Sequence, residues 1–238
     1  MERSESAGLG LRVLVGQRQA SVSTSDFTKD ALEALAERAV AIARQVPEDR
    51  YLSLTPANDL AKDWPALALE DASEPTAEQM LEQCAVMEGA ALSVKGITNS
   101  EGGSAQFARN RIALATSEGF FGAYGGTSHS LSVSVVAGEG LAMERDYEFS
   151  SARFAQDLDD PRSIGQDAAA LALARLNPRK VKTCEVPVIF HPRVGRSLLS
   201  TFTSAISGAA IARGTSFLKD AMGKPVFAPT ITIVDDPH

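Results

Sequence analysis

The chain has 238 residues, of which 44% are hydrophobic and 22% are charged, and its formal net charge is −7 with a sequence pI near 5.1. This composition is typical of a water-soluble globular protein, and no apolar run approaches the roughly 20 residues that span a bilayer. Because phosphate binding needs clustered Lys and Arg, the acidic balance argues against direct nucleic-acid binding.

The N-terminal residues and the cysteines indicate the compartment. Met1 to Ser6 is charged and lacks the basic-then-apolar order of a secretory signal, so we expect a cytoplasmic location and no membrane association. Cys84 and Cys184 are far apart and form no CxxC pair, which favours two ordinary reduced thiols over a disulfide framework or a thiolate metal site.

Residues 9–24 have the pattern of a β-hairpin. Alternate apolar residues in LGLRVLVG (9–16) indicate a half-buried strand, and a turn at 16–19 leads into the second run, ASVSTS. A helix is expected next, capped by Thr28 and ended by Pro47, because apolar residues recur on one face between them.

Residues 47–75 predict a long surface connection, because they contain four prolines and no sustained periodicity. Trp64 is a candidate anchor for this connection. A second helix is expected from Thr76, where Thr76 and Gln79 form a capping-box pattern. The two helices could cover one face of a sheet.

From Val94 to Phe149 the pattern alternates between apolar and polar residues, with glycines at the turns, which predicts an antiparallel meander. A helix should follow over 160–177, then a strand in EVPVIF (185–190), a helix over 193–212 and a strand in TITIV (230–234). The predicted class is α+β: an antiparallel meander sheet packed by helices, followed by the start of a second strand–helix–strand region. We expect an N-terminal domain over 1–180 and the beginning of a C-terminal domain over 181–238.

His191 stands at the start of a helix directly after a strand-like run, which is where a zinc peptidase carries its first ligand. A catalytic zinc site needs three protein ligands, commonly with HExxH on one helical face. The residues that follow are Pro192, Arg193, Val194, Gly195 and Arg196, so neither an acid nor a second imidazole is near. The sequence favours a histidine at a helix entry beside an N1 proline.

Other candidate sites have simpler interpretations. GGTSHS (125–130) places Ser128 beside His129, but a nucleophile elbow needs GxSxG between a strand and a helix, and neighbouring strand residues point to opposite faces. We therefore expect a polar hairpin edge. The acidic cluster of Asp157, Asp159 and Asp160 lacks the spacing of a calcium loop and favours a solvated helix start.

Three stretches carry a resemblance to a known family. They are GLGLRVLVGQRQASVSTSDFT (8–28), SVKGITNSEGGSAQFARNRIALATSEGFFGAYGGTSHSLSVSVVA (93–137) and VPVIFHPRVGRSLLSTFTSAISGAAIARGTSFL (186–218), with APTITIVDDP after the last. In these stretches the chain resembles the PmbA/TldE branch of the TldD/PmbA family, described as modulators of DNA gyrase and as peptidases. The AISG, ARGTSFL and DDP segments follow the family's order and spacing.

The resemblance implies a function for the helix that begins at His191. The TldD branch carries its zinc helix as HExxxH; here His191 matches the first ligand, but Pro192 stands at the acid and Arg196 at the second histidine. The resemblance therefore implies a non-catalytic subunit that pairs with a TldD-like catalytic subunit in a heterodimeric zinc-dependent peptidase for unfolded peptides. Zinc would be held by that partner, with no metal, cofactor or catalytic residue on this chain. His191, Arg193, Arg196 and Arg213 are candidates to face the partner or the substrate.

The resemblance also predicts a fragment, because family members usually begin with a further strand and helix and continue past DDP into a β-rich domain. Two other functions remain open. One is a regulatory protein-binding module that modulates DNA gyrase without peptidase activity. The other is a self-sufficient hydrolase that uses Ser128 or Cys184.

Overall fold

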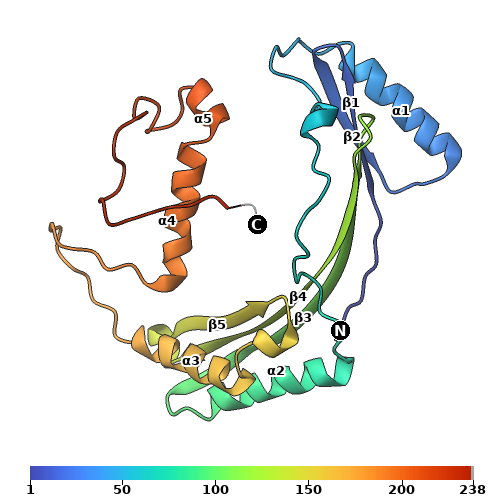
Figure 1. Cartoon of the computed structure of the whole chain (residues 1–238). Helices are drawn as coiled ribbons and strands as arrows, with labels where there is room; N and C mark the ends of the chain where they lie inside the picture. Colours follow the sequence, from blue (N-terminus) through green and yellow to red (C-terminus); the bar gives the residue numbers. More distant parts are fainter. Residues whose placement is uncertain (237–238) are drawn as a thin grey trace. The chain divides into compact units, whose positions relative to one another are not determined.

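The structure is a computed structural model, and it describes residues 1–236 (Figure 1). It divides into two compact units, Met1–Asn177 and the remainder from Pro178, and each is described by itself. The α+β class predicted from the sequence is confirmed, with antiparallel sheets packed by helices.

The first unit begins with the predicted hairpin, formed by β1 (Leu9–Val15) and β2 (Arg18–Thr24) in antiparallel register. Gly16 occupies the turn with a φ of +60°, a conformation that suits glycine in a two-residue hairpin. Helix α1 (Lys29–Ala43) packs against both strands and buries Leu35, Ala39 and Ala43. Thr28 is its N-cap residue, although its side chain makes no capping hydrogen bond.

The second sheet has the order β3–β4–β5, with β3 spanning Ile97–Ala115, β4 spanning Phe121–Ala137 and β5 spanning Glu144–Ala152. The predicted antiparallel meander is therefore confirmed. β5 pairs with β4 only from His129 to Ala137, so β3 and β4 continue beyond it as a two-stranded ribbon. This ribbon exposes Ile112, Leu114, Phe121 and Tyr124.

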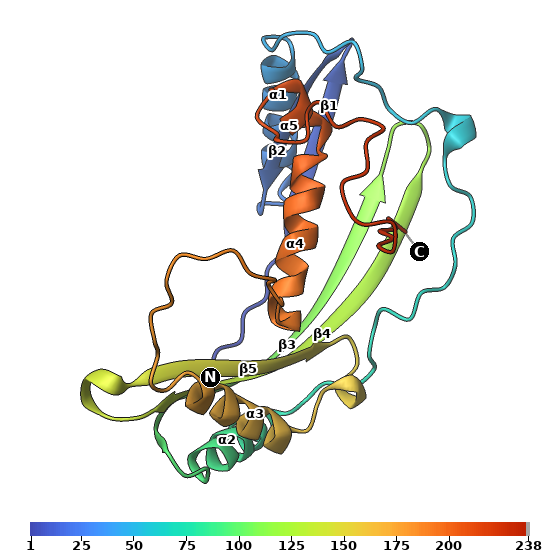
Figure 2. The same cartoon turned by 90° about the vertical axis from the view of Figure 1, so that its left-hand side faces the viewer.

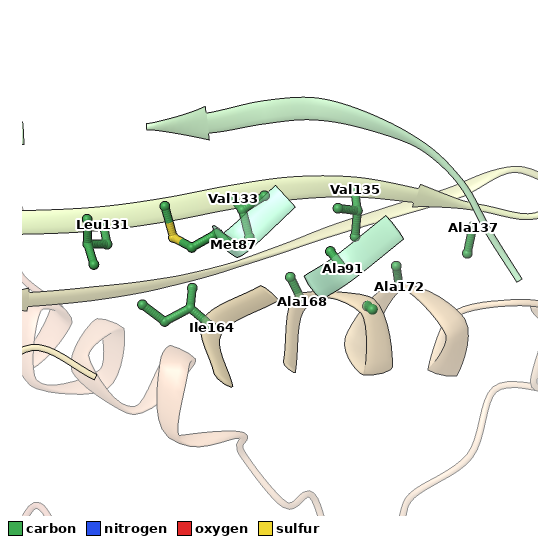
Figure 3. Close-up of a cluster of buried hydrophobic side chains, with 10 residues drawn as sticks. Met87, Ala91, Leu131, Val133, Val135, Ala137, Ile164, Ala168 and Ala172 are labelled. Atoms are coloured by element: carbon green, nitrogen blue, oxygen red, sulfur yellow. The ribbon is translucent and has the colours of Figure 1, made fainter. Parts of the chain in front are cut away.

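Helices α2 (Ala77–Leu92) and α3 (Pro161–Ala174) pack against each other and cover one face of this sheet (Figures 1 and 2). The predicted capping box of α2 is present, since the Thr76 hydroxyl accepts from Gln79 N and the Gln79 side chain accepts from Thr76 N. Asp160 caps α3 and Pro161 stands in its first turn. Figure 3 shows the resulting core, which is made of Met87, Ala91, Leu131, Val133, Val135, Ala137, Ile164, Ala168, Ala169 and Ala172.

Short 3-10 turns complete the first unit. They are η1 (Ala57–Asp59) in the long connection, η2 (Gly140–Ala142) between β4 and β5, and η3 (Ala155–Asp157) after β5. The predicted connection over 47–75 has no longer element than η1. Its Trp64 ring lies 6.2 Å from the ring of Phe120 in the turn of the β3–β4 ribbon, which supports the predicted anchoring role.

The second unit contains α4 (Pro192–Ala205) and α5 (Gly208–Ala212). The single helix predicted over 193–212 is wrong in one respect, because the helix breaks at Ser207, which caps α5. The strands predicted at 185–190 and 230–234 are also absent from the described structure, where both segments are irregular. A strand requires a paired neighbour, and neither segment is paired within the described chain.

Candidate functional site

The N-terminus of α4 is where the sequence places a possible first zinc ligand. His191 is the N-cap residue, and its Nδ1 accepts a hydrogen bond of 3.3 Å from the backbone N of Arg193. Pro192 follows in the first turn, where its missing N–H costs nothing. The imidazole thus caps the helix, as the sequence favours.

The surroundings of His191 do not fit a zinc site. Arg196 stands five residues further along α4 and is exposed, and Arg213 is the exposed C-cap residue of α5. Within residues 1–236, no group of three or more His, Cys, Asp and Glu side chains is placed to hold a metal ion. Zinc is held by Cys, His, Asp or Glu side chains. Arg196 cannot replace such a ligand, because its guanidinium stays protonated and has no free lone pair.

A shallow pocket of about 410 Å³ lies beside the C-terminal half of α4. Its lining residues are small serines, threonines and alanines together with Phe217, and most of the exposed wall is apolar. Ser216 is buried, and its hydroxyl donates to Ala205 O at 2.6 Å and accepts from Leu218 N at 2.9 Å. The ARGTSFL segment is therefore tied to the end of α4, which gives Ser216 a structural role.

The most elaborate polar cluster of the first unit lies on β4 where β5 ends, and the sequence did not predict it. Residues 69–74, here named the strap, run across this point. The backbone N of Thr127 donates to Leu69 O at 3.0 Å, and the Thr127 hydroxyl accepts from Asp71 N at 2.8 Å and donates to Arg153 O at 2.8 Å. Thr127 thereby joins the strap, β4 and the end of β5.

Asp71 is the centre of this cluster. Its Oδ1 accepts from Ser73 N and its Oδ2 from Ala155 N, each at 2.8 Å. These hydrogen bonds, that from Ala155 first, lower the pKa of Asp71 to about 2, with a smaller contribution from His129. The carboxylate is therefore ionised at neutral pH and holds the strap against the residues after β5.

His129 lies beneath the strap and is only 3% exposed. Its Nε2 is 3.3 Å from Asp71 Oδ2, yet that nitrogen makes no hydrogen bond. The imidazole also packs 4.9 Å from the Phe107 ring, centroid to centroid. The polar hairpin edge expected here is wrong for His129, which points to the core face, while Ser128 is exposed as the alternation predicts.

Arg109 fastens the strap from β3. Its guanidinium donates to Glu74 at 3.0 Å and to Asp71 O at 3.2 Å, and lies 3.4 Å from a Glu70 carboxylate oxygen. The Glu70 carboxylate also fills the space next to Gly125, where a Cβ would lie 2.3 Å from Oε2. The cluster resembles a catalytic His–Asp pair only in composition. The described contacts of the imidazole are with the Asp71 carboxylate and the Phe107 ring, and the cluster holds the strap in place.

Acid should loosen the strap through Asp71. Its folded pKa is lowered to about 2, so its contribution to stability is present above the unfolded pKa near 4 and is lost as pH falls towards 2. We expect limited proteolysis of the connection to accelerate between pH 4 and pH 2 with an acid protease, and the acceleration to be smaller in Asp71→Asn. Asp63→Asn, an exposed carboxylate of the same connection, is the control and should behave as wild type.

Sequence comparison supplies the family. Profiles of three family domains match the chain: PmbA/TldA metallopeptidase domain 1 over residues 1–43, the central domain over 70–176 and the C-terminal domain over 183–238. The chain belongs to the PmbA/TldD metallopeptidase family. The resemblance seen in the sequence is confirmed.

Relatives in this family include the metalloprotease PmbA of Escherichia coli and its homologue in Haemophilus influenzae. Each is 35% identical over 239 aligned positions, covering all of this chain and 53% of the relative. The chain therefore spans about half the length of the curated relatives it matches. No helix among residues 1–236 is long and apolar enough to cross a membrane.

Two solved structures of the PmbA/TldD fold resemble the chain. A Bacteroides thetaiotaomicron protein named as a modulator of DNA gyrase has a TM-score of 0.83 and 27% identity, covering 91% of this chain and 50% of that protein. TldE from Thermococcus kodakarensis has a TM-score of 0.69 and 20% identity, covering 88% of this chain and 47% of TldE. At that identity TldE shows the fold alone.

Proposed function

We propose that this chain is part of a non-catalytic, TldE-type subunit that pairs with a TldD-type catalytic chain in a zinc-dependent peptidase for unfolded peptides. The residues at the start of α4 are the main support for this proposal. His191 caps that helix, Pro192 stands at the position of the acid, and Arg196 stands at the position of the second histidine. The naming of the relatives as PmbA metalloproteases supports a role in peptidase chemistry.

In this proposal the metal chemistry belongs to the partner. Zinc would supply a bound water of lowered pKa as the attacking group. The residues of this chain would contribute a surface for the partner and part of the substrate cavity. The predicted division into domains 1–180 and 181–238, and the cytoplasmic location, remain proposals.

The distribution of charge supports an electrostatic role for the second unit. Residues 1–177 carry 15 Lys and Arg against 26 Asp and Glu, a net charge of −11, whereas residues 178–238 carry 8 against 4, a net charge of +4. Between His191 and Leu218 there are three arginines and no carboxylate. We propose that Arg193, Arg196 and Arg213 face acidic groups of the partner or the carboxylates of a bound peptide.

Zinc analysis tests the absence of a metal site on this chain. We expect purified chain, after dialysis against micromolar zinc, to retain far less than one zinc per molecule, and His191→Ala to leave the zinc content unchanged. A TldD-type chain with its HExxxH helix, treated in parallel, should retain one. Stoichiometric zinc that disappears in His191→Ala would contradict the proposal.

A second candidate function is regulation of DNA gyrase by protein contact without peptidase activity. The structural relative named as a gyrase modulator, at 27% identity, favours keeping this candidate. The net charge of −7 favours a protein contact over DNA. A pull-down that recovers gyrase and no TldD-type chain would support it, whereas recovery of a TldD-type chain in equal amount would support the peptidase subunit.

A further inference from the structure

The outer edge of β3 is open and regular where β3 and β4 continue past β5 as a two-stranded ribbon (Figure 2). β3 is the outer strand of the order β3–β4–β5, so only β4 pairs with it. Register shifts in this ladder lie between Ile97 and Gly102, and the pairing is regular from Gly103 onward. Among the described residues, no other segment makes backbone hydrogen bonds with residues 107–115, here named the free edge.

Hydrogen bonds at the two ends of the ribbon show which backbone groups the free edge presents. Thr116 N donates to Phe120 O across the turn, so the amides of the even-numbered residues before Thr116 also point to β4. Thr127 N donates to Leu69 O, on the side of β4 away from β3, and Thr127 is the register partner of Arg109. The backbone groups that point outward are therefore those of the odd-numbered residues Phe107, Arg109, Arg111, Ala113 and Ala115.

The free edge lacks the usual protection against pairing with other strands. Proteins protect exposed edges with prolines, bulges, charged side chains or a covering segment. Residues 107–115 contain no proline and no bulge. The Arg109 side chain is bound to the strap, which leaves Arg111 as the other charge, and every residue from Ala108 to Ala115 is exposed. An edge of this kind fits a partner that stays bound, because a bare one promotes uncontrolled association.

The ribbon also exposes apolar side chains on both faces. Ile112, Leu114 and Tyr124 share one face, since Ile112 pairs with Tyr124 and Leu114 is two residues further along β3. Phe121, which is 68% exposed, pairs with Ala115 on the opposite face. A two-stranded ribbon is at best marginally stable in water, so burial of these side chains against another protein would stabilise it.

We propose that the free edge is a docking site for the TldD-type chain, an assignment that rests on the function proposed above. An extended strand of that chain pairs along residues 107–115, and its apolar side chains pack on the ribbon. Charge favours a different chain over a second copy. Residues 110–125 carry one Arg and one Glu, whereas residues 1–177 have a net charge of −11, so two copies of this unit repel each other.

Amide hydrogen exchange read out by NMR on this chain, with and without an excess of the TldD-type chain, tests the docking. The outward amides of Arg111, Ala113 and Ala115 should exchange about tenfold more slowly when the TldD-type chain is bound, because each gains a hydrogen bond. The amides of Ile112 and Leu114 are the matched reference. They already donate to β4, so partner binding should change their exchange much less.

A proline at an outward position tests the same contact by affinity. Ala113→Pro removes an outward N–H and places a ring at the free edge, while the hydrogen bonds to β4 remain. We expect it to weaken binding of the TldD-type chain about tenfold in calorimetry. Ala113→Ser keeps the N–H and should bind within about twofold of wild type. If Ala113→Pro does not fold, the wild-type exchange measurement decides alone.

The outcomes separate the docking site from the proposed function. Binding of the two chains without slower exchange at the outward amides would overturn docking at β3 and leave the proposed function standing, whereas no binding at all would overturn both. Slower exchange that grows with the concentration of this chain alone would assign the free edge to a second copy. Slower exchange with an unstructured peptide alone would assign it to a peptide ligand, and either result would overturn the proposal.

Discussion

Gly165→Ala is expected to destabilise the first unit by about 3 kcal/mol, the upper part of the range for overpacking a close contact. Gly165 is buried on α3 where this helix meets α2. A Cβ there would lie 2.1 Å from Met87 O and 3.1 Å from the Ala90 Cβ. The obstacle is backbone and a short side chain, neither of which can rotate away, so the two helices must separate and the core beneath them must loosen.

Denaturant unfolding followed by circular dichroism measures the effect of Gly165→Ala. Gly89→Ala is the matched control, because Gly89 lies in α2, is exposed and has nothing within 4 Å of an added Cβ. Its higher helix propensity should stabilise the protein by up to about 1 kcal/mol. A Gly165→Ala variant as stable as wild type would show that α2 and α3 do not pack as closely as described.

Thr127→Val is expected to cost about 2 to 3 kcal/mol, although the two side chains have nearly the same shape. The hydroxyl of Thr127 is buried and makes two hydrogen bonds, so its loss leaves Asp71 N–H and Arg153 C=O without their partner. The damage should be local, and the strap amides should lose protection before the centre of β4 does.

Thermal unfolding together with hydrogen exchange measures the Thr127 effect. Thr98→Val is the control, because the Thr98 hydroxyl also donates to a backbone carbonyl, Gly138 O at 2.7 Å, but is exposed and can be replaced by water. It should cost less than about 1 kcal/mol. Similar losses for the two variants would contradict the assignment of Thr127 as the junction of the strap, β4 and β5.

Much of the first unit could be predicted from local patterns. The capping box of Thr76 and Gln79, the Asp160–Pro161 helix start and the alternation along β4 are short-range signals, and each produced the predicted element. The alternation also contained a signal for His129. Leu131, Val133 and Val135 are buried, so extending the period of two backwards places His129 on the same core face.

The strap could not be predicted in this way. Its contacts join Asp71 to Thr127 and Ala155, which are 56 and 84 residues away along the chain, and the segment has no periodicity of its own. The strands of the second unit were predicted wrongly for a different reason. Residues 185–190 and 230–234 have strand-like composition, but composition cannot supply the pairing partner on which a strand depends.

Peptide cleavage measures the proposed division of labour between this chain and a TldD-type chain. An unstructured peptide is incubated with this chain, with a TldD-type chain from the same source and with both, each with and without a zinc chelator. We predict cleavage that chelator abolishes and that appears only when the two chains are mixed. Chelator-sensitive cleavage by this chain alone, or a mixture no more active than the TldD-type chain, would show that this chain is not a non-catalytic partner subunit.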